Sequence, residues 1–222
     1  MIVAGIDEAG RGPVIGPMVI AGIAMRKHLI KELTEIGVKD SKKMTPNKRK
    51  NLFPKILELA DEYVIRIISP HEIDKAVNMK IGRKYGLLNR MEAKIIAEII
   101  LELKPQVAIV DSPGVNEETF KKMVMESINK KLEVNIISEH KADEKYPIVS
   151  AASIIAKVKR DEIIENLKKE YGDFGSGYPS DPKTREFLKK YYIKNKEFPD
   201  IVRKSWKTLE KIKEEISQTK LL

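Results

Sequence analysis

The sequence contains no cysteine and only one tryptophan in 222 residues. Without cysteine, disulfide bonds, zinc–thiolate sites and thiol catalysis are all excluded. No uncharged stretch approaches the ~20 apolar residues that a membrane-spanning helix needs. No basic region precedes the first apolar run, which ends at Asp7, so the N-terminus does not follow the pattern of a signal peptide. These absences predict a soluble protein of the cytoplasm that has no membrane partner.

Charged residues, in contrast, are abundant. Lys and Arg total 42 against 33 acidic residues, a formal net charge of +9. Such an excess is typical of a protein that binds a polyanion, most often a nucleic acid. A charge-rich surface of a heat-adapted protein is the alternative interpretation. The hydrophobic content of 42% is enough for a packed core, so we do not expect disorder.

The order of the expected helices and strands indicates an α/β protein. β-branched apolar runs predict strands at 1–6, 18–25, 63–68, 107–110 and 134–138. Helical spacing, proline and capping residues predict helices at 45–60, after Ser69-Pro70, and at 87–103, 117–131, 148–169, 182–195 and 201–217. A polar loop is expected at 139–145. A stretch dense in Gly and Pro, 171–182, predicts a main domain at 1–172 and a linker with a small helical subdomain at 173–222.

Acidic side chains cluster at the predicted strand ends. Asp7 and Glu8 end the first strand, Asp111 ends the fourth, and Asp143 follows the fifth. Sites in open α/β sheets form at the carboxyl ends of strands. If strands one and four are parallel neighbours, Asp7 and Asp111 converge. Carboxylate oxygens suit Mg²⁺ or Mn²⁺ better than zinc, and two such ions about 3.5–4 Å apart can act on a phosphodiester.

A Gly-Arg-Gly turn follows the first acid pair. The glycines allow backbone to approach a ligand closely, and an arginine is suited to a phosphate. The run 10–16 superficially resembles a dinucleotide-binding loop. That interpretation fails because acids stand where a pyrophosphate would approach, the glycine spacing is wrong, and a strand rather than a helix follows.

Taken together, several motifs identify a family. They are Asp7-Glu8-Ala-Gly-Arg-Gly-Pro13, Asp40-Ser-Lys-Lys43, His140-Lys-Ala-Asp143, Ser150-Ala-Ala-Ser-Ile-Ile-Ala-Lys157, Gly175-Ser-Gly-Tyr-Pro-Ser-Asp-Pro182 and Trp206-Lys-Thr208. In this order, across nearly the whole chain, they resemble type 2 ribonuclease H (RNase HII) of the archaeal style. The resemblance implies an RNase H-like fold, with a central five-stranded mixed sheet flanked by helices and a C-terminal helical subdomain.

The resemblance also implies an activity. It is endonucleolytic hydrolysis of RNA paired to DNA, with incision 5′ to ribonucleotides embedded in duplex DNA, leaving 3′-hydroxyl and 5′-phosphate ends. The implied cofactor is Mn²⁺ or Mg²⁺, in a two-metal mechanism. The implied catalytic, metal-binding acids are Asp7, Glu8, Asp111 and Asp143. Asp111 departs from the family pattern in being followed by Ser-Pro-Gly.

Further residues have implied substrate roles. The turn Gly10-Arg11-Gly12 resembles the element that senses the ribose 2′-hydroxyl, the group that separates RNA from DNA. Tyr178 resembles the tyrosine that packs against the sugar, although a tyrosine in a Gly-rich loop can also be a structural plug. Lys42 and Lys43 resemble the lysines that contact a phosphate in this family. The alternative is that they are ordinary solvent-exposed lysines.

Other positions are interpreted from the residues themselves. We expect His140 to be structural, with a proton shuttle or a contact to a metal ligand as the alternatives, and Ser150–Ala156 to be a packing stretch of small residues rather than a nucleophile. The basic C-terminal helices, with Arg203, Lys204 and Lys207 near Trp206, are expected to clamp the duplex backbone. The tail 218–222 is faintly similar to a sliding-clamp-binding segment but lacks its aromatic pair.

Two other functions remain open at this point. A non-catalytic protein that binds RNA/DNA hybrids would need its acids to be incidental. A resolvase-like nuclease on the same fold would be indifferent to ribose. We expect a monomer, since no sequence feature demands an oligomer.

Overall fold

The computed structural model describes residues 1–39, 41–78 and 87–219. Asp40 of the predicted Asp-Ser-Lys-Lys motif and the last three residues of the predicted clamp-binding tail lie outside the described residues. None of the helices within those ranges is both long and apolar enough to cross a membrane.

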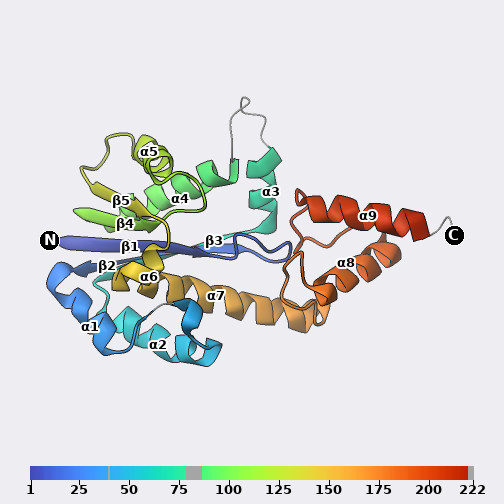
Figure 1. Cartoon of the computed structure of the whole chain (residues 1–222), viewed down its shortest axis with the longest axis horizontal. Coiled ribbons are helices and arrows are strands. Elements are labelled where there is room, and N and C mark those ends of the chain that lie inside the picture. The colour runs from blue at the N-terminus through green and yellow to red at the C-terminus, as the bar shows by residue number, and fades with distance from the viewer. Residues whose placement is uncertain (40, 79–86, 220–222) are drawn as a thin grey trace. The chain divides into compact units, whose positions relative to one another are not determined.

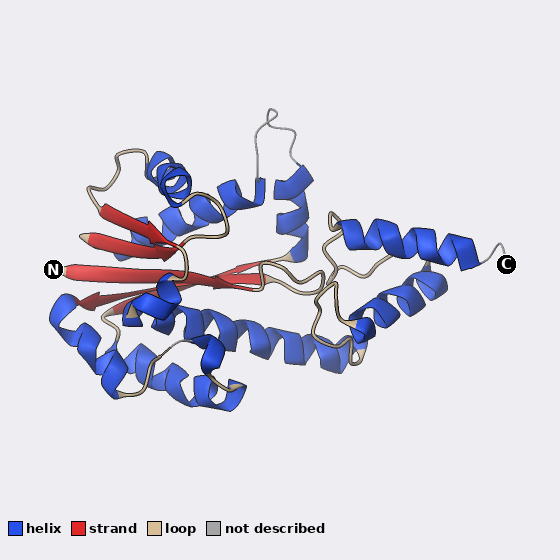
Figure 2. Cartoon of the chain, in the orientation of Figure 1, coloured by secondary structure: helices blue, strands red, loops and turns tan. Residues whose placement is uncertain are grey.

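The chain divides into two compact units (Figures 1 and 2). The first, the sheet unit, comprises Met1–Ala9, Val19–Ile67 and Leu88–Arg160. The second, the helical unit, comprises Gly10–Met18, Ile68–Leu87 and Asp161–Leu222. The predicted division into a catalytic domain at 1–172 and a linker with a helical subdomain at 173–222 stays a prediction.

The five strands form one mixed sheet in the order β3-β2-β1-β4-β5 (Figure 2). β1 pairs antiparallel with β2 and parallel with β4, and β4 pairs parallel with β5. This confirms the predicted five-stranded mixed sheet. The strands are β1 (Ile2–Ala9), β2 (Met18–Arg26), β3 (Glu62–Ile68), β4 (Val107–Asp111) and β5 (Asn135–Glu139).

Helices cover both faces of this sheet. A Cβ at Gly5 in β1 would meet the backbone of Ile148 in α7 (Pro147–Tyr171) at 2.5 Å. A Cβ at Gly22 in β2 would meet Ile99 in α4 (Leu87–Leu103) at the same distance. Gly22 is paired with Ile6, and successive strand residues face opposite sides. α7 and α4 therefore pack on opposite faces, and the two glycines permit their close approach.

Three of the remaining helices, α2, α5 and α8, begin at a capping side chain. Thr45 caps α2 by accepting a hydrogen bond from the Lys48 amide at 3.3 Å, with Pro46 as first residue. Asn116 caps α5 and Asp181 caps α8 in the same way. The remaining elements are η1 (Lys27–Leu29), α1 (Ile30–Glu35), η2 (Ser41–Lys43), α2 (Pro46–Leu59), α3 (Pro70–Asn78), α5 (Glu117–Ile128), α6 (Ala142–Lys145), α8 (Pro182–Asn195) and α9 (Lys207–Thr219).

The helical unit has a hydrophobic core of its own. Phe174, Leu188, Phe198 and Ile212 are buried together with Val14 and Ile15 from the segment after β1. Apolar residues from two separate stretches of sequence, Gly10–Met18 and Asp161–Leu222, therefore share one core, and this explains why Gly10–Met18 belongs to this unit.

Three expectations about elements are wrong. The first strand continues through Ala9 rather than ending at residue 6, because its pairing with β2 runs to Ala9 opposite Val19. Residues 142–145 of the expected polar loop form α6. The last helix begins at Lys207 rather than at 201, because Val202 forms an isolated β-bridge with Ile15.

Candidate active site

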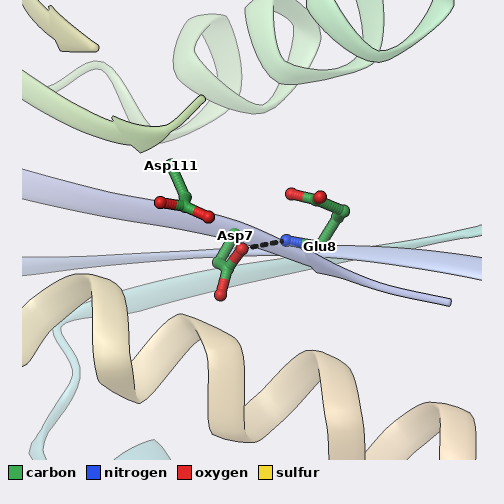
Figure 3. Close-up of side chains that lie close together, drawn as sticks. All are labelled: Asp7, Glu8 and Asp111. Atoms are coloured by element: carbon green, nitrogen blue, oxygen red, sulfur yellow. Dashed lines mark hydrogen bonds between the residues drawn. The ribbon is translucent and has the colours of Figure 1, made fainter. Parts of the chain in front are cut away.

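Three carboxylates meet at the carboxyl ends of two neighbouring strands. Asp7 and Glu8 lie near the end of β1, and Asp111 is the last residue of the parallel strand β4. One carboxylate oxygen from each lies within 4.8 Å of the others (Figure 3). The convergence expected from the strand order is therefore present.

Although adjacent in sequence, Asp7 and Glu8 project to opposite sides of β1 (Figure 3). This follows from the alternation of side chains along a strand. Asp7 lies on the side of α7 and is only 5% exposed, whereas Glu8 is half-buried. The Asp7 carboxylate accepts a hydrogen bond from the Glu8 amide at 2.7 Å. The two carboxylates therefore leave β1 on opposite faces, yet one oxygen of each lies within 4.8 Å of an oxygen of Asp111.

The electrostatics of Asp7 are unfavourable without a cation. Burial raises the pKa of Asp7 well above its usual value, and the charges of Glu8 and Asp111 raise it further. A hydrogen bond with Ser153 acts in the opposite direction but is outweighed. A buried carboxylate among like charges is a feature of functional sites more than of structural ones.

Asp111 is oriented by the backbone of the next acidic segment. Its Oδ1 accepts a hydrogen bond from the Ala142 amide at 2.6 Å, at the start of α6. Burial raises the pKa of Asp111, the bond from Ala142 lowers it, and the charge of Asp143 raises it. Lys141, which precedes α6, has a left-handed backbone with φ of 57°, a conformation that non-glycine residues rarely adopt.

Asp143 lies outside the 4.8 Å group but belongs to the same electrostatic environment. It is 2% exposed, and its charge raises the pKa of both Asp7 and Asp111. Its Oδ1 accepts a hydrogen bond from Lys42 Nζ at 3.2 Å. Its Oδ2 is buried and has no hydrogen-bond partner within the described residues. A buried carboxylate oxygen without a hydrogen-bond partner destabilises the folded protein unless it binds a ligand.

A polar network lies on the α7 side of Asp7. Ser41 and Ser153 are buried with their hydroxyls 2.9 Å apart, and Lys157 donates to Ser41 Oγ. Burial lowers the pKa of Lys157. Sequence reasoning assigned Ser150–Ala156 to packing alone and so missed Ser153. The signal available was its position one turn before Lys157 within a helix that faces the acids.

The donor set fits a hard divalent cation. All the converging atoms are carboxylate oxygens, the ligands that Mg²⁺ and Mn²⁺ prefer. The raised pKa of Asp7 and Asp111 and the unpartnered oxygen of Asp143 both show negative charge that needs compensation. No described cysteine is available, and histidine does not contribute to the group.

The Gly-Arg-Gly turn is built within the helical unit. Gly10 has φ of 84°, which requires glycine, and Gly12 is exposed. A Cβ at Gly12 would lie 3.4 Å from the Tyr178 ring, which is 44% exposed. Tyr178 therefore lines this turn rather than plugging the core. Gly10 follows Asp7 by three residues, so chain geometry alone keeps their Cα atoms within about 11 Å.

The expectation for Arg203 is wrong. Its side chain is fully buried and donates to the carbonyl oxygens of the turn, so it is not available to clamp a duplex backbone. Lys204 and Lys207, its predicted companions, are exposed.

The remaining predicted positions are placed as follows. Lys42 is paired with Asp143 at 3.2 Å and lies 3.9 Å from Glu144, while Lys43 is exposed at the end of η2. His140 Nδ1 donates to the Ser112 carbonyl at 3.1 Å, and its amide donates to Glu117 at 2.6 Å. These bonds agree with the structural role expected for His140.

Comparison with known proteins connects this geometry to a family. A family model described as Ribonuclease HII matches residues 4–209. The ribonuclease HII of Pyrococcus furiosus is 50% identical over 222 residues, covering 99% of this chain and 95% of the relative. The crystal structure of ribonuclease H2 from Pyrococcus horikoshii OT3 matches with a TM-score of 0.87 and 47% identity, covering 98% of this chain and all of that chain.

A third relative was solved with a partner. The structure of the PCNA:RNase HII complex from Archaeoglobus fulgidus matches with a TM-score of 0.82 and 44% identity, over 95% of this chain and 96% of that chain. Both the family model and the relatives extend over almost the full length of this chain. This chain is therefore a nuclease that belongs to the ribonuclease HII family.

Proposed function

We propose that this protein hydrolyses the RNA strand of RNA/DNA hybrids and incises duplex DNA on the 5′ side of embedded ribonucleotides. The products would carry 3′-hydroxyl and 5′-phosphate ends. One observation carries the proposal: in a ribonuclease HII chain, three carboxylates converge within 4.8 Å, and a Gly-Arg-Gly turn follows the first two after one residue.

The acids would hold the metal. Asp7, Glu8 and Asp111 supply the converging oxygens, and Asp143 supplies a further buried one. When bound there, divalent ions, Mn²⁺ or Mg²⁺ and in this proposal two of them, would supply a more acidic water and charge stabilisation for the leaving oxygen of a phosphodiester. The chain's own contribution is orientation. The Glu8 amide fixes the Asp7 carboxylate, the Ala142 amide fixes Asp111, and Ser153 bonds Asp7 from α7.

The Gly10-Arg11-Gly12 turn would recognise the ribose. A backbone that approaches a sugar closely cannot carry side chains at the contact, and the exposed Gly12 meets this requirement. The exposed ring of Tyr178 beside Gly12 would pack on the sugar at the RNA–DNA junction. Lys43 would contact a phosphate, and Lys42 would do so in addition to its bond with Asp143.

The decisive experiment uses a labelled DNA duplex with a single ribonucleotide, incubated with Mg²⁺ or Mn²⁺. We expect one incision, on the 5′ side of the ribonucleotide, and none in the matched all-DNA duplex. A hybrid with a continuous RNA strand should be cut at several positions. Titrating the two ions separately would identify the one that supports the faster rate.

Each alternative function gives a different result. A non-catalytic hybrid-binding protein would bind both ribonucleotide substrates without cutting them, and EDTA would change nothing measurable. A resolvase-like nuclease would cut the all-DNA duplex as well. Asp7→Asn is the matched control, because it should abolish incision while leaving folding and duplex binding largely intact.

A sliding clamp is a further proposed partner. The Archaeoglobus fulgidus relative was solved in complex with PCNA, and residues 218–222 of this chain are the segment to delete in a clamp-binding assay. If deletion leaves binding to a clamp unchanged, the tail is not the contact. A monomeric state and a cytoplasmic location stay predictions.

A further inference from the structure

The Gly-Arg-Gly turn is held from behind by its carbonyl oxygens. Arg203 donates from Nη2 to the Gly10 carbonyl at 2.5 Å, from Nη1 to Arg11 at 2.9 Å, and from Nε to Gly16 at 3.0 Å. Trp206 Nε1 donates to the Gly12 carbonyl at 3.1 Å. Two side chains therefore bond the carbonyls of all three residues in the turn.

These hydrogen bonds determine the direction in which the backbone amides of the turn point. In a trans peptide the carbonyl of one residue and the amide N–H of the next point in opposite directions. Because the Gly10 and Arg11 carbonyls point at the Arg203 guanidinium, the Arg11 and Gly12 amides point away from it. The guanidinium thus sets which face of the turn carries donors.

The guanidinium is itself fixed in place. Arg203 is fully buried, and its Cζ lies 5.0 Å from the centre of the Trp206 ring. Its amide donates to the Val14 carbonyl at 2.9 Å, beside the β-bridge between Ile15 and Val202. A planar fork of donors in a packed site has little freedom to follow a displaced loop.

Asp74 anchors the stretch that carries both side chains. From α3 it accepts hydrogen bonds from the Lys204 amide at 2.6 Å, the Ser205 amide at 2.8 Å and the Ser205 hydroxyl at 2.5 Å. These bonds hold residues 204–205 between Arg203 and Trp206. The anchor, the two donors and the turn all belong to the helical unit.

We propose that Arg203 and Trp206 are specificity-positioning residues, which fix the Gly10–Gly12 backbone so that its amide face can distinguish a ribose from a deoxyribose. This rests on the proposed function, because the turn must be the ribose contact. Arg203 acts through the turn and does not touch the substrate. Its loss should reduce the preference for ribose more than it reduces duplex binding as such.

The test is a binding measurement in full-length protein carrying Asp7→Asn, so that the substrate stays intact. Fluorescence anisotropy gives the Kd for a duplex with one ribonucleotide and for the matched all-DNA duplex in Mg²⁺. The parent should prefer the ribonucleotide. Arg203→Lys, which keeps the charge but loses the fork, should reduce this ratio at least about fivefold, the effect of losing roughly one hydrogen bond.

Two further variants distinguish a positioning role of Arg203 from an effect of its charge and from a loss of folding. Trp206→Phe keeps a ring over Arg203 but removes the donor to Gly12, and should reduce the same ratio about threefold. Lys204→Met removes one exposed positive charge next to Arg203, and should weaken binding to both duplexes alike while leaving the ratio unchanged. Thermal unfolding confirms that each variant is folded, and Trp206→Phe carries the test if Arg203→Lys is not.

The outcomes distinguish this inference from the function on which it rests. If the parent has no ribose preference and the unmodified protein incises nothing, the proposed function is refuted and this inference with it. If the parent prefers ribose and a folded Arg203→Lys or Trp206→Phe protein keeps the full ratio, the positioning role alone is refuted. An equal loss of ratio in Lys204→Met would show that charge, not the carbonyl bonds, is responsible.

Discussion

Replacing Asp7 with asparagine should stabilise the metal-free protein while abolishing its activity. Asp7 is buried against two other carboxylates, and both burial and their charges raise its pKa. Asparagine has the same shape and removes the charge. Its side-chain oxygen can still accept the Glu8 amide, and its nitrogen can donate to the Ser153 hydroxyl, so few hydrogen bonds are lost.

The magnitude follows from the separation of the charges. Carboxylate oxygens within 4.8 Å repel by about 3.5 kcal/mol per pair at an effective dielectric constant of about 20, and by about 0.9 kcal/mol in water. Because Glu8 and Asp111 are partly exposed, we expect removal of one charge to relieve about 1–3 kcal/mol. For a chain of this size, this raises the unfolding temperature by roughly 2–10 °C.

The pH dependence has a definite sign. With its raised folded-state pKa, Asp7 binds more protons in the native protein than in the unfolded chain. Its contribution is therefore fully stabilising below the ordinary value of 3.8 and is lost as the pH rises through the raised pKa. Calorimetry of the metal-free proteins should show the gap between Asp7→Asn and the unmodified protein widening from pH 4 towards neutral pH.

Asp181 is a matched control of opposite sign. Hydrogen bonds from Ser176 lower its pKa to about 2, so its stabilising contribution is present above pH 3.8 and is lost as the pH falls. Asp181→Asn should therefore lower the unfolding temperature at neutral pH. If Asp7→Asn in EDTA leaves the unfolding temperature unchanged or lowers it, the inference that Asp7 is electrostatically strained without metal is wrong.

Three further predictions concern the surroundings of the acids. Gly5→Ala should cost about 1–3 kcal/mol in a denaturant titration, because its Cβ would meet α7 backbone at 2.5 Å; Gly22→Ala should also destabilise, because its Cβ would meet the buried Ile99 Cγ2 at the same distance. Ser153→Ala should weaken metal affinity about 10-fold or more by calorimetric titration, since it removes a bond that orients Asp7, and unchanged affinity would contradict that role. Lys43→Met should reduce the slope of log K against log salt for duplex binding by about 1, and an unaltered slope would exclude a phosphate contact.

Local sequence patterns were sufficient for most of the fold. The strands at 18–25 and 107–110 and the helix at 87–103 are where the apolar periodicity predicts them, since a buried run or an amphipathic face has few alternative structures. The errors fall where tertiary contacts outweigh propensity. Residues 201–206 were predicted to begin the last helix, but the bridge to Ile15 and the bonds to Asp74 hold them in an irregular conformation.

For the site, the sequence was a good guide to residue types and a poor guide to their partners. The placement of Asp7, Glu8 and Asp111 at strand ends predicted convergence, and the parallel pairing of β1 with β4 brings it about. Nothing in the sequence indicated that the Ala142 amide orients Asp111, and the position of Ser153 one turn before Lys157 did not by itself show that Ser153 bonds Asp7. Such contacts join residues far apart in the chain, and no local periodicity records them.

Arg203 shows most clearly where the two kinds of information divide. The sequence alone determines a basic, cysteine-free α/β chain with an acid pair and a Gly-Arg-Gly turn beside it, because composition and local spacing are properties of the chain itself. A basic side chain can bind a phosphate of a ligand only if it is exposed, and a buried one bonds groups of the protein instead. Burial depends on packing between segments that are far apart in the sequence. Only the tertiary structure placed Arg203 in the interior, behind the turn, where its guanidinium bonds three backbone carbonyls.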